Sequence, residues 1–144
     1  MRTEPSIGYV KDTGTPMGRG VYASRPIASG ETIEICPVIL VSGDFDDLPM
    51  EIRRIVFDWS ALAKTKGVHA IALGYGSMYN HANPANLRYE ACGGGQFLRF
   101  TAVTPIAQDA ELTVNYNAFG GYPTSDEDTW FESVEVELIK RESE

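Results

Sequence analysis

Short stretches in which apolar and polar residues alternate dominate the chain, and this period of two is typical of strands. Ile33 and Ile35 alternate with polar neighbours and lead into an apolar run, so the pattern predicts a strand over residues 32–41. A shorter strand is predicted over residues 21–23. Because proline cannot donate a ladder hydrogen bond, Pro37 indicates a bend, a bulge or an edge position within the longer strand.

One stretch has helical spacing instead. In residues 48–62, Ile52, Ile55 and Trp59 recur at helical intervals, and Pro49 suits a first helical turn. The pattern therefore predicts a single helix over this stretch, and it is the only helix expected before the C-terminal region.

The second half of the chain returns to short strands. The pattern predicts strands over residues 68–73, 87–92, 96–103 and 111–114, and the three glycines at 93–95 indicate a hairpin between the middle two. Short strands at close spacing around one helix predict a mainly β fold built from small curved sheets.

A helix start is indicated near the C-terminus. Thr124 or Ser125 supplies an N-cap, and the acidic residues 126–128 suit the positive end of a helix dipole. We expect a short C-terminal helix through Trp130 and Phe131. The domain organisation expected is one domain over residues 1–123, followed by a helical and charged segment over residues 124–144.

Composition narrows the class of protein. A chain of 144 residues is long enough for one domain with its own core. No apolar run reaches the roughly 18 residues of a membrane span, and the N-terminus lacks a signal-peptide pattern, so cytoplasm is the default expectation. The two cysteines, Cys36 and Cys92, are too few for a disulfide framework and are expected to be reduced thiols. No metal site is expected.

The acidic charge is concentrated at the C-terminus. The net charge of −8 divides into −6 over residues 126–144, which hold eight acidic and two basic residues, and −2 over the rest. Direct binding of nucleic acid is disfavoured because phosphate contacts need a basic face. A basic peptide partner is compatible with this charge, although most acidic runs are solvated surface.

Three short segments carry the candidate chemistry. They are Gly-Arg-Gly-Val-Tyr at 18–22, Tyr-Asn-His at 79–81 and Glu-Leu-Thr-Val-Asn-Tyr at 111–116. Each alone has an ordinary explanation as a tight turn, a capped turn with a core histidine, or a core tyrosine at a strand end. The order and separation of the three segments distinguish this chain from those ordinary cases.

In that order the segments resemble the SET domain, the catalytic fold of most protein-lysine methyltransferases, from about residue 6 to residue 116. The resemblance implies a β-clip fold with a pseudoknot-like threading that packs the Asn-His segment against the segment ending at Tyr116. It also implies transfer of a methyl group from S-adenosylmethionine (AdoMet) to a lysine amine. One departure is local: the family usually reads Asn-His-Ser-x-x-Pro-Asn, whereas residues 82–84 here are Ala-Asn-Pro.

The resemblance also implies roles for individual residues. Tyr116 takes the place of the catalytic tyrosine, and His81 is expected to shape the site and not to act as a general base. The residues implied for the cofactor are Gly18, Arg19, Gly20, Tyr79, Asn80, His81 and, as part of a lid, Trp130. The aromatic residues implied as walls of the lysine channel are Tyr89, Phe119, Tyr122 and Phe131, although each could equally cover an edge of the core.

The expected substrate is a lysine in a basic, extended segment, such as a histone tail or a basic bacterial protein. The chain resembles compact bacterial and viral SET proteins without cysteine-rich flanking segments, which are compatible with a monomer or a homodimer. In a eukaryotic host, action on chromatin would imply a nuclear protein. The alternative is a non-catalytic β-clip module that binds a peptide or a small ligand.

Overall fold

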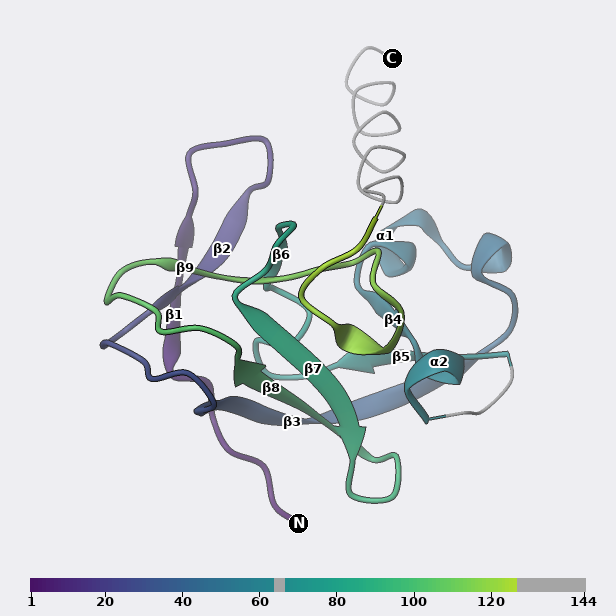
Figure 1. Ribbon diagram of the computed structural model, residues 1–144. Helices are drawn as coiled ribbons and strands as arrows, with labels where there is room; N and C mark the ends of the chain where they lie inside the picture. The colour runs from purple at the N-terminus through teal and green to yellow at the C-terminus, as the bar shows by residue number, and fades with distance from the viewer. Residues whose placement is uncertain (64–66, 127–144) are drawn as a thin grey trace.

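The structure is a computed structural model that describes residues 1–63 and 67–126, and these residues form two curved sheets (Figure 1). The expected mainly β fold is confirmed. The strands predicted over residues 21–23, 32–41, 68–73, 87–92, 96–103 and 111–114 are all present, some with ends shifted by one or two residues.

The smaller sheet brings together the N-terminal hairpin and two segments from later in the chain. Its order is β1-β2-β9-β6. β6 is only two residues long and runs parallel to β9, with Asn80 opposite Thr113 and His81 opposite Val114. This pairing joins the expected Asn-His segment to the expected Glu-Leu-Thr segment. The strands are β1 (Gly8–Asp12), β2 (Arg19–Ala23), β6 (Asn80–His81) and β9 (Glu111–Val114).

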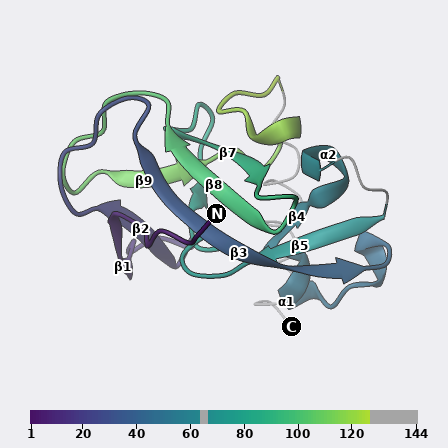
Figure 2. The ribbon, with the colours of Figure 1, turned by 90° about the horizontal axis from the view of Figure 1, so that it is seen from below.

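The larger sheet has the order β4-β5-β3-β8-β7, and the long strand β3 lies at its centre (Figure 2). β3 changes partner midway: residues up to Pro37 pair with β8, and residues from Val38 onward pair with β5. Pro37 therefore ends one ladder, where its missing N–H costs little. The strands are β3 (Thr32–Ser42), β4 (Val56–Asp58), β5 (Val68–Ala72), β7 (Leu87–Cys92) and β8 (Phe97–Ala102).

The prediction of one helix over residues 48–62 is wrong. The stretch instead forms α1 (Met50–Arg53), strand β4 and α2 (Trp59–Ala63), and the 3₁₀ turn η1 (Phe45–Asp47) precedes it. Val56 and Phe57 are a β-branched and an aromatic residue, and they pair with β5. The carboxylate of Asp58 then accepts a hydrogen bond from the Ser60 N–H at 3.1 Å, which starts α2.

One hydrophobic core joins the inner faces of both sheets. Phe100 on β8 is fully buried, and the rings of Phe57, Tyr79 and Tyr89 surround it with centroid separations of 6.3, 4.7 and 5.9 Å. Because this aromatic cluster is close-packed, it fixes the positions of the two tyrosine hydroxyls, which both form buried hydrogen bonds. The core thus sets the geometry of the site.

Cys36 is buried, Cys92 is half-buried, and both are free thiols. Within residues 1–63 and 67–126 no group of three metal-ligating side chains is present, and no helix there is long and apolar enough to cross a membrane. The predicted C-terminal helix lies outside the described residues.

Candidate active site

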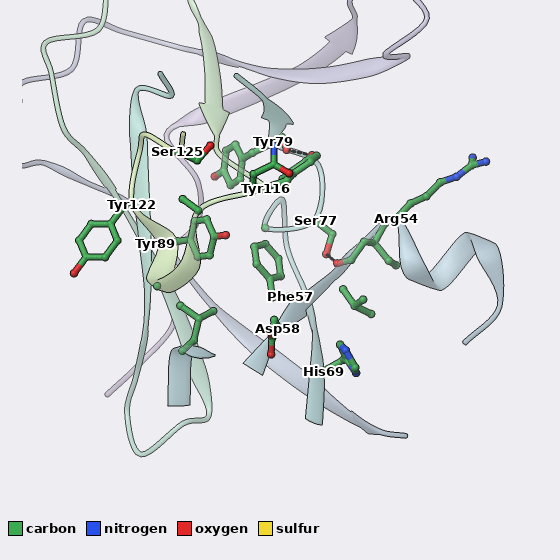
Figure 3. A pocket seen from close by; sticks show the side chains of 18 of the residues that line it. Arg54, Phe57, Asp58, His69, Ser77, Tyr79, Tyr89, Tyr116, Tyr122 and Ser125 are labelled. Carbon is green, nitrogen blue, oxygen red and sulfur yellow. Dashed lines mark hydrogen bonds between the residues drawn. The ribbon is translucent and has the colours of Figure 1, made fainter. Parts of the chain in front are cut away.

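A cavity of about 730 Å³ opens beside the aromatic cluster (Figure 3). The aromatic residues Phe57, Tyr79, Tyr89 and Tyr116 are among those that line it. The segment between α1 and β4 and the chain after β9 form its two sides. Figure 3 shows Tyr79, Tyr89 and Tyr116 gathered at one end and Asp58 and His69 at the other.

Tyr116 is held in the cavity wall by two hydrogen bonds. Its hydroxyl donates to the Tyr79 carbonyl oxygen at 2.5 Å, and its backbone N–H donates to Nδ1 of His81 at 3.0 Å. Burial raises the pKa of the Tyr116 hydroxyl well above its usual value, and the nearby Tyr89 and Glu111 add to this. The hydroxyl therefore stays protonated near neutral pH and can act as a hydrogen-bond donor.

The role open to His81 follows from the same contact. Nδ1 accepts a hydrogen bond, so in the neutral ring the proton lies on Nε2. The ring also stacks at a tilt on Tyr116, with centroids 5.4 Å apart. The imidazole thus fixes the backbone and ring of Tyr116, which is the geometry of a site-shaping residue.

Tyr79 and Asn80 are neighbours in the chain, and their side chains serve different parts of the site. Tyr79 lines the cavity, whereas the Asn80 amide donates to the Arg19 carbonyl at 3.0 Å and to Oε2 of Glu111 at 2.8 Å. Successive residues of an extended segment point to opposite sides, which accounts for the division. All three motifs therefore meet at this short segment.

The glycine turn before β2 is closed by its own hydrogen bonds: the Gly18 N–H donates to the Thr15 carbonyl at 3.0 Å, and the Gly18 carbonyl accepts from the Thr13 N–H at 2.8 Å. Gly18 has φ of +76°, and a Cβ built there would meet no atom within 4 Å. Gly20 is the opposite case, because a Cβ would lie 2.6 Å from Oε2 of Glu111 and 3.0 Å from the Asn80 amide nitrogen. The turn is thus close-packed on the Asn80 side, and there is open space beside the Cα of Gly18.

The predicted channel residues occupy different positions. Tyr89 is buried in the cavity wall; its hydroxyl donates to the Asn115 carbonyl at 3.4 Å, and burial raises its pKa to about 12. Tyr122 lies at the rim, where its side chain is 59% exposed and points away from Tyr116. Phe119 begins the 3₁₀ turn η2 (Phe119–Gly121). Trp130 and Phe131 lie outside the described residues, so their roles stay predictions.

A group that the sequence did not reveal ties the chain after β9 to the core. Asn115 is fully buried, and its amide donates to Oγ of Ser125 at 3.0 Å. Asn83 donates to the Ser125 carbonyl at 2.9 Å. We call Asn83, Asn115 and Ser125 the C-terminal clasp. Asn83 is part of the departure from the family motif, and that departure was the available signal.

Charged groups are distributed unevenly around the cavity. Asp58 and Asp126 are exposed and line it. Arg54 also borders it, but Figure 3 shows that its side chain points away from the tyrosines. Within the described residues, Nδ1 of His69 is buried without a hydrogen-bond partner. The exposed edge of the cavity therefore carries acidic groups, with Asp58 at the end away from the tyrosines.

Comparison with known proteins places this site in a family. The sequence profile of the SET domain matches residues 18–117. The histone-lysine N-methyltransferase of Schizosaccharomyces pombe that is specific for H3 lysine-37 is 28% identical over 99 residues. That match covers 69% of this chain and 66% of the relative, slightly under two thirds of the relative's length.

Solved structures share the fold at low identity. The Plasmodium falciparum protein PFL0690c is 22% identical, with a TM-score of 0.64 over 79% of this chain and 95% of that one. The Chaetomium thermophilum polycomb repressive complex 2 bound to S-adenosylmethionine is 18% identical, with a TM-score of 0.60 over 96% of this chain and 17% of that one. The profile match covers more than half of the chain, so the protein belongs to the SET-domain family.

Proposed function

We propose that the protein is a protein-lysine N-methyltransferase that uses AdoMet and acts on a lysine in a basic, extended segment, such as one of a histone or histone-like protein. The observation that carries this proposal is the Tyr116 hydroxyl, held in the cavity wall by the Tyr79 carbonyl. Beside it lies the segment over residues 79–81, in which the Asn80 amide donates to the Arg19 carbonyl of the glycine turn.

The cavity suits a lysine side chain that must lose its charge before it reacts. A free lysine has a pKa near 10.4, so making it neutral near pH 7.4 costs roughly 4 kcal/mol. Burial among the aromatic rings of Phe57, Tyr79, Tyr89 and Tyr116 disfavours the charged form and lowers that pKa. Such desolvation makes a strong side-chain base unnecessary, and it agrees with His81 being used as an acceptor.

Two oxygen atoms can orient the resulting amine. The Tyr79 carbonyl and the Tyr116 hydroxyl are already 2.5 Å apart, so an amine beside them meets one acceptor and one donor-acceptor group. Alignment of the reacting atoms can supply much of the catalytic effect of an enzyme. A fixed hydroxyl dipole next to the reacting carbon also stabilises charge that develops there.

The residues proposed for AdoMet are those of the glycine turn and the Asn80 segment. The open space beside Gly18, the side chain of Asn80 and the backbone of His81 would hold the carboxylate, amine and ring of the cofactor. When bound, AdoMet supplies the methyl group as an electrophile. Arg19 is proposed to contribute through its backbone, as the family resemblance implies, and its carbonyl is held in place by the hydrogen bond from Asn80.

The segment after residue 123 is proposed as a lid. Many SET enzymes close this side of the site with a cysteine-rich zinc segment, and here Trp130 and Phe131 would take that role. The C-terminal clasp supports the proposal because it fixes Ser125 five residues before Trp130. If the AdoMet affinity and the turnover rate of Trp130→Ala equal those of the unaltered protein, the proposal that this segment is a lid is refuted.

The acidic rim supports a basic substrate. Asp58 and Asp126 border the cavity, and opposite charges at a rim steer and select a partner more than they tighten binding. Peptides that carry arginine beside the target lysine should therefore be methylated faster than peptides that carry glutamate there. A preference for the acidic peptides would contradict this choice of substrate class.

A methyl-transfer assay tests the proposal. The purified protein is incubated with labelled AdoMet and a panel of basic proteins, alongside Tyr116→Phe and the control Tyr9→Phe. The control removes an exposed hydroxyl that donates to Asp109 at 2.8 Å, away from the cavity. We expect transfer by the unaltered protein and by Tyr9→Phe, and none by Tyr116→Phe. If none of the three proteins transfers a methyl group although AdoMet binds tightly, the alternative of a non-catalytic module is favoured.

The altered loop at residues 82–84 is the feature that favours this alternative. A thermal-shift measurement with AdoMet separates a cofactor-binding protein from an unrelated module, because a ligand that binds only the folded state raises the melting temperature. The methyl-transfer assay then separates an active enzyme from an inactive one.

A further inference from the structure

Glu34 is a carboxylate buried in the middle of the larger sheet. Only 3% of its surface is exposed, and it lies on β3 outside the lining of the cavity. Burying a carboxylate is costly unless hydrogen bonds satisfy its oxygen atoms. Oε1 accepts from the Tyr79 hydroxyl at 2.7 Å, and Oε2 accepts from the Tyr75 backbone N–H at 3.0 Å. The donors are both neutral, and both belong to the loop before β6.

That loop is shaped around the carboxylate. Gly74 has φ of +65°, and a Cβ built there would lie 2.4 Å from Oε2 of Glu34. A side chain at this position would therefore collide with the carboxylate. The Tyr79 hydroxyl also lies 2.8 Å from Oγ of Ser6, so its oxygen is engaged on two sides. Glu34 consequently anchors the loop at both of its ends, once through backbone and once through a side chain.

The anchored loop ends at the group that holds the proposed catalytic tyrosine. The Tyr79 carbonyl accepts the hydrogen bond from the Tyr116 hydroxyl at 2.5 Å. The Tyr79 ring is 1% exposed and packs on Phe100, so Tyr79 is fixed at its hydroxyl, its ring and its carbonyl. A change at Glu34 would release the hydroxyl and rotate or shift the carbonyl.

We propose that Glu34 is a positioning residue for Tyr116 and acts through Tyr79. This inference rests on the proposed function, in which Tyr116 is the catalytic residue. Glu34 does not touch the cavity, and its role is to fix the loop over residues 74–79. Asn80, one residue further on, is held separately by Glu111 and Arg19. The proposal therefore predicts that loss of Glu34 slows turnover and leaves cofactor binding intact.

The kinetic experiment compares Glu34→Ala, Glu34→Gln and Tyr79→Phe with the unaltered protein. Misplacement of a reacting group by a fraction of an ångström to 1 Å costs about tenfold to a hundredfold in rate, so we expect Glu34→Ala and Tyr79→Phe to lose that much of kcat. The Kd for AdoMet should stay within about twofold, since the hydrogen bonds of Asn80 remain. Tyr79→Phe removes a single oxygen atom and carries the test if Glu34→Ala does not fold.

Glu34→Gln is the conservative variant. Its amide oxygen can accept from the Tyr75 N–H, and its amide nitrogen can donate to the Tyr79 oxygen, which then donates to Ser6. We expect kcat of Glu34→Gln within about threefold of the unaltered protein, because the loop stays anchored. Full kcat in folded Tyr79→Phe would overturn the proposal. So would an equal loss of kcat and of AdoMet affinity, which is the result of general destabilisation.

Hydrogen exchange supplies a readout that does not depend on catalysis. In folded Tyr79→Phe and Glu34→Ala, exchange at the Tyr116 amide should become faster, because its position depends on the anchored loop. If exchange becomes faster only at the Tyr75 amide, Glu34 has a local role and the proposal fails. If the unaltered protein transfers no methyl group while Tyr116 responds as expected, the coupling stands and the proposed function alone fails.

Discussion

Asn80 links the three motifs of the site, and its replacement by alanine has a calculable cost. The Asn80 amide donates one hydrogen bond to the Arg19 carbonyl at 3.0 Å and one to the Glu111 carboxylate at 2.8 Å. Asn80 is 9% exposed, so water does not readily replace the lost donors. A hydrogen bond to a neutral group contributes about 1 kcal/mol to stability, and one to a charged group about 1.5 to 3 kcal/mol. The free energy of unfolding should therefore fall by about 2.5 to 4 kcal/mol.

Thermal and urea unfolding measure this loss. For a domain of this size, 1 kcal/mol corresponds to about 3 °C in Tm, so Asn80→Ala should melt about 8 to 12 °C below the unaltered protein. Its AdoMet affinity should fall as well, because the glycine turn loses its connection to β6.

A variant that adds a negative charge at position 80 provides the matched comparison for Asn80→Ala. Asn80→Asp places a second carboxylate within hydrogen-bond distance of Glu111 and should be less stable than Asn80→Ala. Adding Glu111→Gln to Asn80→Asp restores a donor and an acceptor at that contact and should recover most of the difference. The reasoning is refuted if Asn80→Asp is as stable as the unaltered protein, or if the double variant is no better than Asn80→Asp alone.

Three further outcomes follow from other contacts. Asn83→Ala removes the hydrogen bond to the Ser125 carbonyl and should lower the free energy of unfolding, measured in urea, by about 1 kcal/mol. An unchanged midpoint of urea unfolding would show that the C-terminal clasp does not stabilise the protein. Burial raises the pKa of the Cys36 thiol to about 12, so at pH 8 a thiol reagent should modify Cys92 first and Cys36 only after unfolding; two equally fast thiols would contradict this. Burial also raises the pKa of Glu34 above 4.5, so its stabilising effect is complete below pH 4.5 and is lost as the pH rises through the higher folded value. Glu34→Gln should flatten that pH dependence, and an unchanged slope would show that another group causes it.

Elements that depend only on a local turn and a local hydrophobic pattern could be predicted from the sequence. The hairpin of β7 and β8 lies where the glycines at 93–95 indicated it, and β9 has the predicted bounds. Pairing between distant segments was not predictable in this way. β6 is two residues long, and only its parallel partner β9 makes it a strand. β1 likewise depends on its pairing with β2.

The stretch over residues 48–62 shows why periodicity alone misled. Its apolar residues recur at helical spacing, but Val56–Asp58 found a partner in β5, and tertiary pairing overrode the helical pattern. Trp59 is buried whichever element carries it, so its spacing could not distinguish a continuous helix from a strand followed by a short helix.

The motifs located the centre of the site and missed its supports. Tyr79, Asn80, His81 and Tyr116 were all recognised by resemblance, and the structure brings them into contact. The role of Glu34 could not be predicted from the sequence, because its partner Tyr79 lies 45 residues away and no local pattern marks a buried carboxylate. The same holds for the three members of the C-terminal clasp, which are joined only by folding.

The most direct test of the central claim is a crystal structure of the protein with S-adenosylhomocysteine and a peptide that contains lysine. We predict that the cofactor product lies against Gly18 and Asn80, and that the lysine amine lies in the cavity within hydrogen-bond distance of the Tyr116 hydroxyl. A cofactor bound away from residues 79–81, or a lysine that enters elsewhere and does not contact Tyr116, would contradict the proposed function.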